Sequence, residues 1–108
     1  MGEPQESLVI GTRREGATAI VELQGELDLY GSPKLVAAVT EALADKPEAV
    51  VIDAAGLTFA DSAGLRAFLI ARKDADAAGA GFSLSPVSEP LDRVLEMTGL
   101  REALGATP

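Results

Sequence analysis

The spacing of apolar residues predicts two adjoining strands near the N-terminus. Residues 8–12 alternate with a period of two, which is typical of an edge strand, and residues 14–16 predict a tight turn. A second strand over residues 17–27 keeps its polar side chains on even positions, so that one face meets the core. Its apolar face consists of Ala19, Val21, Leu23 and Leu27. Because a short turn joins the two strands, we expect them to be antiparallel.

A helix and a third strand follow. Gly31-Ser32-Pro33 predicts a helix start, since Ser32 can cap free backbone N–H groups and Pro33 at the first helical position loses no needed donor. The apolar side chains Leu35, Val36, Val39 and Leu43 then recur at helical spacing. Pro47 ends this helix, and the apolar run 49–52 predicts a strand buried on both faces. A strand–helix–strand crossover is therefore expected.

Residues 53–61 are predicted to form a loop before a second helix. Asp61 or Ser62 can cap that helix, which is expected to end near Gly79. Gly64 stands in the first turn, where glycine costs about 1 kcal/mol relative to alanine. A residue without a side chain there would let another backbone approach the helix start closely.

The remaining chain predicts a short strand over residues 82–84 and a third helix. That helix opens at Ser88-Glu89-Pro90 and ends at Thr98-Gly99, and residues 100–104 offer one more helical turn. The element order predicts an α/β fold, with a small mixed β-sheet of roughly four to five strands covered by roughly three to four helices. We expect one domain over residues 1–108, with its core at about residues 8–104.

Composition narrows the possible functions. The 108 residues include no Cys and no His, which excludes disulfides, thiolate or imidazole catalysis, and nitrogen or sulfur metal ligands. The formal charge of −8 argues against nucleic-acid binding, which needs Lys and Arg to neutralise phosphates. No apolar run reaches the ~20 residues that span a bilayer, and residues 1–6 are polar and unlike an export signal. We expect a cytoplasmic protein without metal or membrane contact.

Sites in such folds gather on the loops that follow strands, here residues 25–32 and 53–64. The simplest interpretation of Asp61-Ser62 is a capping device, and the alternative is an exposed serine hydroxyl at a helix N-terminus, where a phosphate would be tolerated. Asp28, Asp53 and Asp61 could in principle pair for acid–base chemistry, but caps and turns explain such residues better. Tyr30 is expected to be a packing residue beside a partner surface.

Four segments together resemble one family. These are Gly25-Glu26-Leu27-Asp28, Val50-Val51-Ile52-Asp53, the stretch from Phe59 to Leu65, and Met97-Thr98-Gly99-Leu100. In this order they resemble the bacterial anti-sigma factor antagonists of the STAS domain family, over nearly the whole chain. The resemblance implies a STAS-like fold.

The resemblance also implies a switch. The regulated serine of the family corresponds to Ser62, and a partner kinase that is itself an anti-sigma factor would phosphorylate it with its own ATP, so that no cofactor is needed here. A phosphatase would remove the phosphate. Asp28 matches a family acidic residue close to the serine. The implied partner-binding residues are Asp28, Tyr30, Asp61, Ser62, Ala63, Gly64, Leu65 and Arg66.

Two positions depart from the family pattern. Many relatives have a second serine where this chain has Ala63, which leaves Ser62 as the sole acceptor of the motif. Relatives also have glycine where this chain has Arg66, so a bulky cation stands on the implied contact helix. Arg66 could pair with an acidic partner residue or change partner choice.

The expected function is therefore that of an anti-sigma factor antagonist, a monomer or weak dimer that frees a sigma factor for transcription by occupying its anti-sigma kinase. Residues 16–62 carry eight acidic and two basic side chains, so the partner face should be basic or a helix terminus. An alternative is a STAS subunit of a larger stress-signalling or lipid transport complex, never phosphorylated. A small carboxylate-based hydrolase is a third interpretation, without a nameable base or oxyanion hole.

Overall fold

The computed structural model describes residues 7–108, where strands and helices alternate after an initial hairpin. The elements are β1 (Leu8–Glu15), β2 (Thr18–Leu27), α1 (Ser32–Ala44), β3 (Ala49–Ala60), α2 (Ser62–Ala77), β4 (Gly81–Val87) and α3 (Glu89–Thr98). The prediction that residues 1–6 are not an export signal lies outside the described residues. No helix in the described part of the chain is long and apolar enough to cross a membrane.

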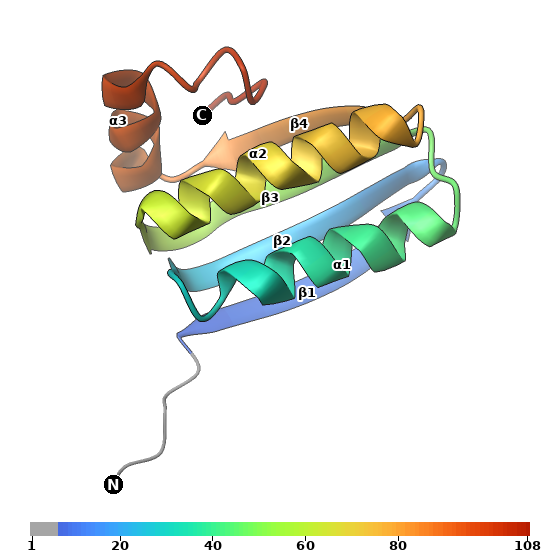
Figure 1. Cartoon of the computed structure of the whole chain (residues 1–108), viewed down its shortest axis with the longest axis horizontal. Coiled ribbons are helices and arrows are strands. Elements are labelled where there is room, and N and C mark those ends of the chain that lie inside the picture. Colours follow the sequence, from blue (N-terminus) through green and yellow to red (C-terminus); the bar gives the residue numbers. More distant parts are fainter. Residues whose placement is uncertain (1–6) are drawn as a thin grey trace, which may run out of the picture.

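The four strands form one mixed sheet in the order β1-β2-β3-β4. β1 is an edge strand and pairs antiparallel with β2, whereas β2, β3 and β4 run parallel to one another. Figure 1 shows α1 and α2 side by side across one face of the sheet, while α3 stands beyond the end of β3 and β4. The predicted α/β architecture with a small mixed sheet is confirmed.

The core lies between the sheet and the pair α1 and α2. The predicted apolar face of β2 is confirmed, because Val21, Leu23 and Leu27 are fully buried and Ala19 is nearly so. The same core contains Phe68 of α2 and other fully buried side chains from the helices, the neighbouring strands and the C-terminal segment: Leu35, Val39, Ile52, Leu57, Leu84, Leu91, Leu95 and Leu104. Each large apolar side chain contributes about 1.5 to 3 kcal/mol by leaving water, so this layer holds the helices on the sheet.

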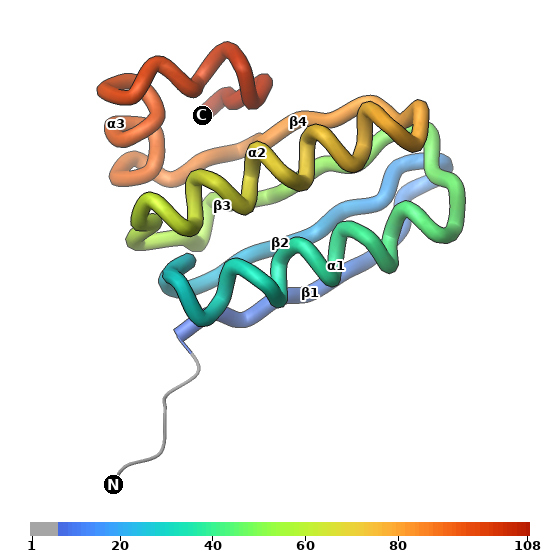
Figure 2. Tube along the Cα trace, in the orientation of Figure 1, coloured from blue at the N-terminus to red at the C-terminus, as the bar shows by residue number. Residues whose placement is uncertain are grey.

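The opposite face of the sheet carries no helix in the described residues (Figure 1). Because strand side chains alternate, Ile20, Val51 and Ser83, which pair in register, point to this second face. Val51 is only partly buried, so the prediction that residues 49–52 are buried on both faces is wrong. Figure 2 shows the same one-sided arrangement of the two long helices.

The strands extend further than the apolar runs suggest. The predicted loop over residues 53–61 is wrong, since β3 continues to Ala60 by pairing with the far half of β2. The register shifts there, which accommodates Gly56 and explains why the strand carries no regular apolar pattern. β1 likewise continues to Glu15, so the turn shifts to residues 16–17, where Gly16 adopts a positive φ of 61°.

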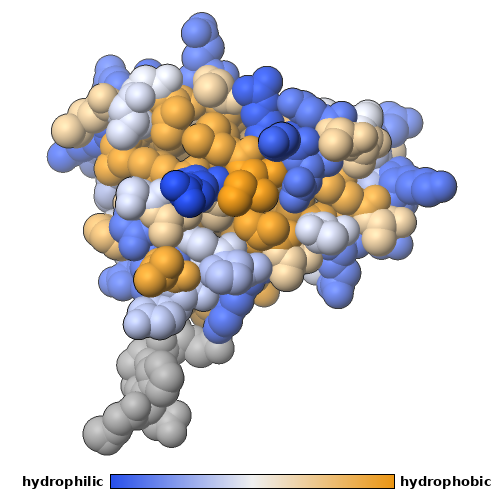
Figure 3. Space-filling model, in the orientation of Figure 1, coloured by the Kyte–Doolittle hydropathy of each residue, from blue (hydrophilic) through white to orange (hydrophobic). Residues whose placement is uncertain are grey.

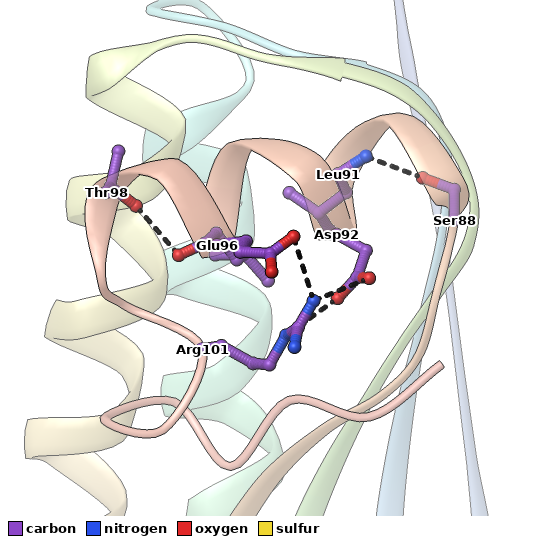
Figure 4. Close-up of polar contacts among 7 residues, drawn as sticks. Ser88, Leu91, Asp92, Glu96, Thr98 and Arg101 are labelled. Atoms are coloured by element: carbon purple, nitrogen blue, oxygen red, sulfur yellow. Dashed lines mark hydrogen bonds and ion pairs between the residues drawn. The ribbon is translucent and has the colours of Figure 1, made fainter.

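The C-terminal segment after α3 forms the predicted helical turn over residues 100–104, where the Leu104 N–H donates to the Leu100 carbonyl at 3.0 Å, and then returns to the sheet. Thr107 donates its N–H to the Leu84 carbonyl and accepts from the Val87 N–H, at 3.1 and 3.0 Å. Arg101 anchors this segment, because its guanidinium contacts the Asp92 carboxylate at 3.0 and 2.8 Å (Figure 4). Pairing of Thr107 with the edge of β4 satisfies backbone groups of Leu84 and Val87.

Candidate functional site

The two loops singled out in the sequence meet at one edge of the sheet. β2 and β3 are parallel, so their carboxyl ends lie together, and Leu27 pairs with Ala60 in register. The Asp61 N–H donates to the Leu27 carbonyl oxygen at 3.2 Å. The turn into α1 and the start of α2 are therefore fixed against each other.

Asp28 organises the turn between β2 and α1. Its Oδ1 accepts hydrogen bonds from the backbone N–H groups of Tyr30 and Gly31, both at 3.0 Å. Ser32 does not cap α1 as predicted. Its hydroxyl donates back to the Asp28 carbonyl at 2.7 Å, and Gly31 occupies the cap position without a side-chain bond. The Asp28 carboxylate thus orders the turn that precedes α1, and it does not cap N–H groups within the helix.

The same turn presents apolar side chains to solvent. Tyr30 is 81% exposed and Leu29 is 65% exposed. The prediction that Tyr30 packs is wrong, because its side chain is exposed and the Asp28 carboxylate contacts only its backbone N–H. Phe59, at the end of β3, is 49% exposed at the same edge. Exposed aromatic side chains of this kind are enriched in protein interfaces.

Asp61, and not Ser62, caps α2. Its Oδ1 accepts from the Gly64 N–H at 2.9 Å, and its carbonyl accepts from the Leu65 N–H, also at 2.9 Å. Ser62 begins the helix and is exposed, and its hydroxyl makes no hydrogen bond within residues 7–108. The structural task of the Asp-Ser pair thus belongs to the aspartate, which leaves the serine hydroxyl available for chemistry.

Gly64 confirms the close backbone approach that its position predicted. A Cβ at this residue would lie 2.6 Å from the Leu27 carbonyl oxygen and 2.9 Å from Leu27 Cγ. Real Cβ atoms do not come so near to backbone oxygen. The next residue, Leu65, is partly buried and packs against the core. These two implied contact residues position the helix start, and the exposed surface comes from their neighbours.

A groove of about 690 Å³ runs between α1 and α2 and reaches Ser62. It is lined by Leu29, Ser32, Pro33, Val36, Ala37, Ser62, Ala63, Arg66, Ala67 and Ile70. Among the described residues, Arg66 is the only charged side chain in this lining. Figure 3, in the orientation that faces α1 and α2, shows apolar side chains gathered across this surface. A partner that contacts Ser62 therefore also meets an apolar surface.

Sequence reasoning missed two residues that line the groove, Leu29 and Ile70, and also the exposed Phe59 at the end of β3. An apolar pair at 29–30 within a turn was an available signal, because turns are usually polar. Phe59 lay in a segment taken for a loop. Ile70 could not be separated from the core stripe of α2, since its exposure depends on where α1 lies.

The three aspartates considered for acid–base chemistry do not share a cleft. Asp28 and Asp61 accept backbone hydrogen bonds at the carboxyl edge. Asp53 accepts from the Ala55 N–H at 3.1 Å and, by strand alternation, faces the side of the sheet that lacks α1 and α2. Among the described residues no group of three carboxylates is placed to hold a metal ion. All three serve as turn or cap acceptors, as the simpler interpretation held.

Residues 10–105 match the family model described as "Mlab, STAS domain". The chain belongs to the STAS domain family. A curated relative, the anti-sigma-F factor antagonist RsfB of Mycobacterium tuberculosis, is 33% identical over 61 residues, which cover 56% of this chain and 50% of RsfB. The chain therefore matches only about half the length of that relative.

Solved structures share the fold of this STAS domain. An anti-sigma factor antagonist from Mycobacterium paratuberculosis superposes with a TM-score of 0.84 at 25% identity, covering 94% of this chain and 86% of that one. The anti-sigma factor antagonist SpoIIAA in its unphosphorylated form gives a TM-score of 0.76 at 20% identity, with 93% and 89% covered. The predicted STAS-like fold is confirmed.

Proposed function

We propose that this STAS domain is an anti-sigma factor antagonist whose binding is switched by phosphorylation of Ser62. The observation that carries the proposal is the free, exposed Ser62 hydroxyl at the mouth of an apolar groove. Similarity to an RsfB segment and to the Mycobacterium paratuberculosis antagonist supports the class of function. The partner is an anti-sigma factor serine kinase, and a phosphatase restores the unmodified serine.

The unphosphorylated protein binds the kinase through the carboxyl edge. Tyr30, Leu29 and Phe59 offer exposed apolar area beside Ser62, and Arg66 offers one positive charge. Occupied in this way, the kinase releases its sigma factor. The antagonist thus acts by binding, in the cytoplasm, and catalyses no reaction itself.

Phosphorylation reverses binding by charge. The Ser62 Oγ attacks the γ-phosphorus of the kinase's ATP, a new O–P bond forms, ADP departs, and the hydroxyl proton passes to a base of the kinase. The product carries about −1.5 to −2 additional charge at pH 7. A like charge in a protein contact costs several kcal/mol, and about 2.7 kcal/mol already lowers affinity ~100-fold.

The test is a capture experiment from host lysate with tagged Ser62→Ala and Ser62→Asp proteins, read by mass spectrometry. We expect the Ala form to retain a serine kinase of the anti-sigma type and the Asp form to lose it. Asp74→Asn, a charge change further along α2 and outside the groove, is the matched control and should bind like wild type.

The alternative function gives a different result in the same experiment. A constitutive subunit of a stress-signalling or lipid transport complex would be captured in one assembly by both Ser62 variants. That outcome would reject the phosphorylation switch and leave Ser62 as an ordinary first residue of α2.

A further inference from the structure

Ser62 and Arg66 lie on the same face of α2. They are four residues apart, which places their Cβ atoms about 5 to 6 Å from each other on a helix. Both line the groove between α1 and α2, so neither side chain is turned away from the other. Both are exposed, and neither is held by the core.

Arg66 has no electrostatic partner in the described part of the chain. Four of the other arginines form ion pairs, namely Arg13, Arg72, Arg93 and Arg101. Arg66 forms none within residues 7–108 although the protein is strongly acidic. The one cation of the groove is therefore available to an anion beside it.

We propose that Arg66 binds the phosphate of phosphorylated Ser62 within the same chain. This inference rests on the proposed phosphorylation of Ser62. A guanidinium presents a planar fork of N–H donors that matches two phosphate oxygens, and a negative group four residues before a positive one is the favourable order on a helix. Phosphorylation then alters the groove twice, by adding a dianion and by engaging its only cation.

Two consequences follow for the phosphorylated protein. The partner loses Arg66 as a contact at the same moment that it meets the phosphate, so binding is lost more completely than by the phosphate alone. The paired phosphate is also shielded from phosphatases, which prolongs the modified state. Arg66 is thus a positioning residue that sets the lifetime of the switch.

The test uses full-length protein with phosphoserine inserted at residue 62 during translation, so that no kinase is needed. A ³¹P NMR titration gives the pKa of the phosphate in wild type and in Arg66→Gln, Arg66→Lys and Lys73→Gln. Lys73→Gln removes the same charge from α2 outside the groove and is the matched control. Asp28 and Asp61 lie near the phosphate in every variant, so the comparison isolates Arg66.

We expect Arg66→Gln to raise the pKa of the phosphate by a few tenths of a pH unit, because the cation that favours the dianion is gone. Arg66→Lys should give an intermediate value, and Lys73→Gln should match wild type. Dephosphorylation by a non-specific phosphatase should be up to about twofold faster in Arg66→Gln, in line with the ~0.2–0.5 kcal/mol of a helical pair. Equal pKa values and equal rates in Arg66→Gln and wild type would overturn the proposal.

The result is separable from the proposed function. If host kinases leave Ser62 unmodified, the capture experiment fails while the titration still shows the Arg66 pair. If the pair is absent but the Ala and Asp forms still differ in kinase capture, the switch stands and only the role of Arg66 is rejected.

Discussion

Three neighbouring residues at the start of α2 have separate tasks. Asp61 caps the helix, Ser62 carries a hydroxyl that has no hydrogen bond within residues 7–108, and Gly64 makes room for the Leu27 backbone. This division allows Ser62 to be modified without loss of the cap. It also allows stability and function to be measured at different positions.

Replacing the cap should cost stability where replacing the serine does not. We expect Asp61→Ala to lower the free energy of unfolding by about 1 kcal/mol, because the Gly64 N–H loses its acceptor. Ser62→Ala and Ser62→Asp should unfold within about 0.5 kcal/mol of wild type in urea. A large loss in either Ser62 variant would show that the hydroxyl is structural.

Gly64→Ala should destabilise the protein by about 1 to 2 kcal/mol. The new Cβ meets backbone oxygen at 2.6 Å, and this clash outweighs the ~1 kcal/mol gained in helix propensity. Gly11→Ala is the control, since its Cβ would meet only the Glu22 side chain at 3.9 Å. Equal unfolding midpoints for the two variants would contradict the close approach of Leu27.

Among the elements, the C-terminal segment is contacted by two arginines, because the Arg72 guanidinium of α2 donates to the Ala103 carbonyl and Arg101 pairs with Asp92. Arg101 joins it to α3 through Asp92, and Glu96 lies 3.7 Å away (Figure 4). We expect Arg101→Gln to cost on the order of 1 kcal/mol and to raise hydrogen exchange at the Val87 and Thr107 N–H groups. Arg93→Gln, which removes an exposed pair at 3.9 Å, should leave both amides protected.

Unchanged hydrogen exchange of these amides in Arg101→Gln would instead show that the backbone pairing with β4 holds the segment without Arg101. The stability of the segment would then come from its backbone hydrogen bonds to β4, and the Arg101–Asp92 ion pair would contribute little. The Val87 and Thr107 amides distinguish these two cases because both donate the hydrogen bonds that join the segment to β4.

The elements were predictable where their signals were local. Helix starts with Pro at the first turn and the glycine after α3 mark boundaries within the sequence itself, and Gly99 indeed adopts a positive φ of 74°. The second half of β3 carries no such signal, because its pairing with β2 depends on a register shift. The helical turn over residues 100–104 was predictable from its own apolar residues, whereas the return of residues 105–107 to the edge of β4 was not, because that course depends on where β4 lies.

The candidate site was predictable in part. Asp61, Ser62 and Gly64 follow from a short motif, and their assignments could be checked against single hydrogen bonds and one close approach. The groove could not be predicted, because it forms only where α1 lies beside α2. Ile70 illustrates the difficulty, since a stripe of apolar residues does not show which members remain uncovered.

At the scale of the whole molecule, charge should govern how the partner arrives. With a formal charge of −8, the protein should associate with a basic kinase face about tenfold more slowly in 500 mM than in 50 mM salt. Stopped-flow association, with the dissociation rate recorded in parallel, measures this effect. A rate independent of salt would indicate that apolar contacts alone determine the encounter.

The bond from the Asp61 N–H to Leu27, together with the missing side chain at Gly64, holds the start of α2 closely against the end of β2. Under the proposed switch, a phosphate on Ser62 would therefore act on a partner from a fixed position. The rate of such a switch would be set by enzyme turnover and diffusion, and the phosphorylated state would last as long as the phosphate ester does. A cell could change the lifetime of the phosphorylated state through the abundance of the phosphatase, with no alteration to this protein.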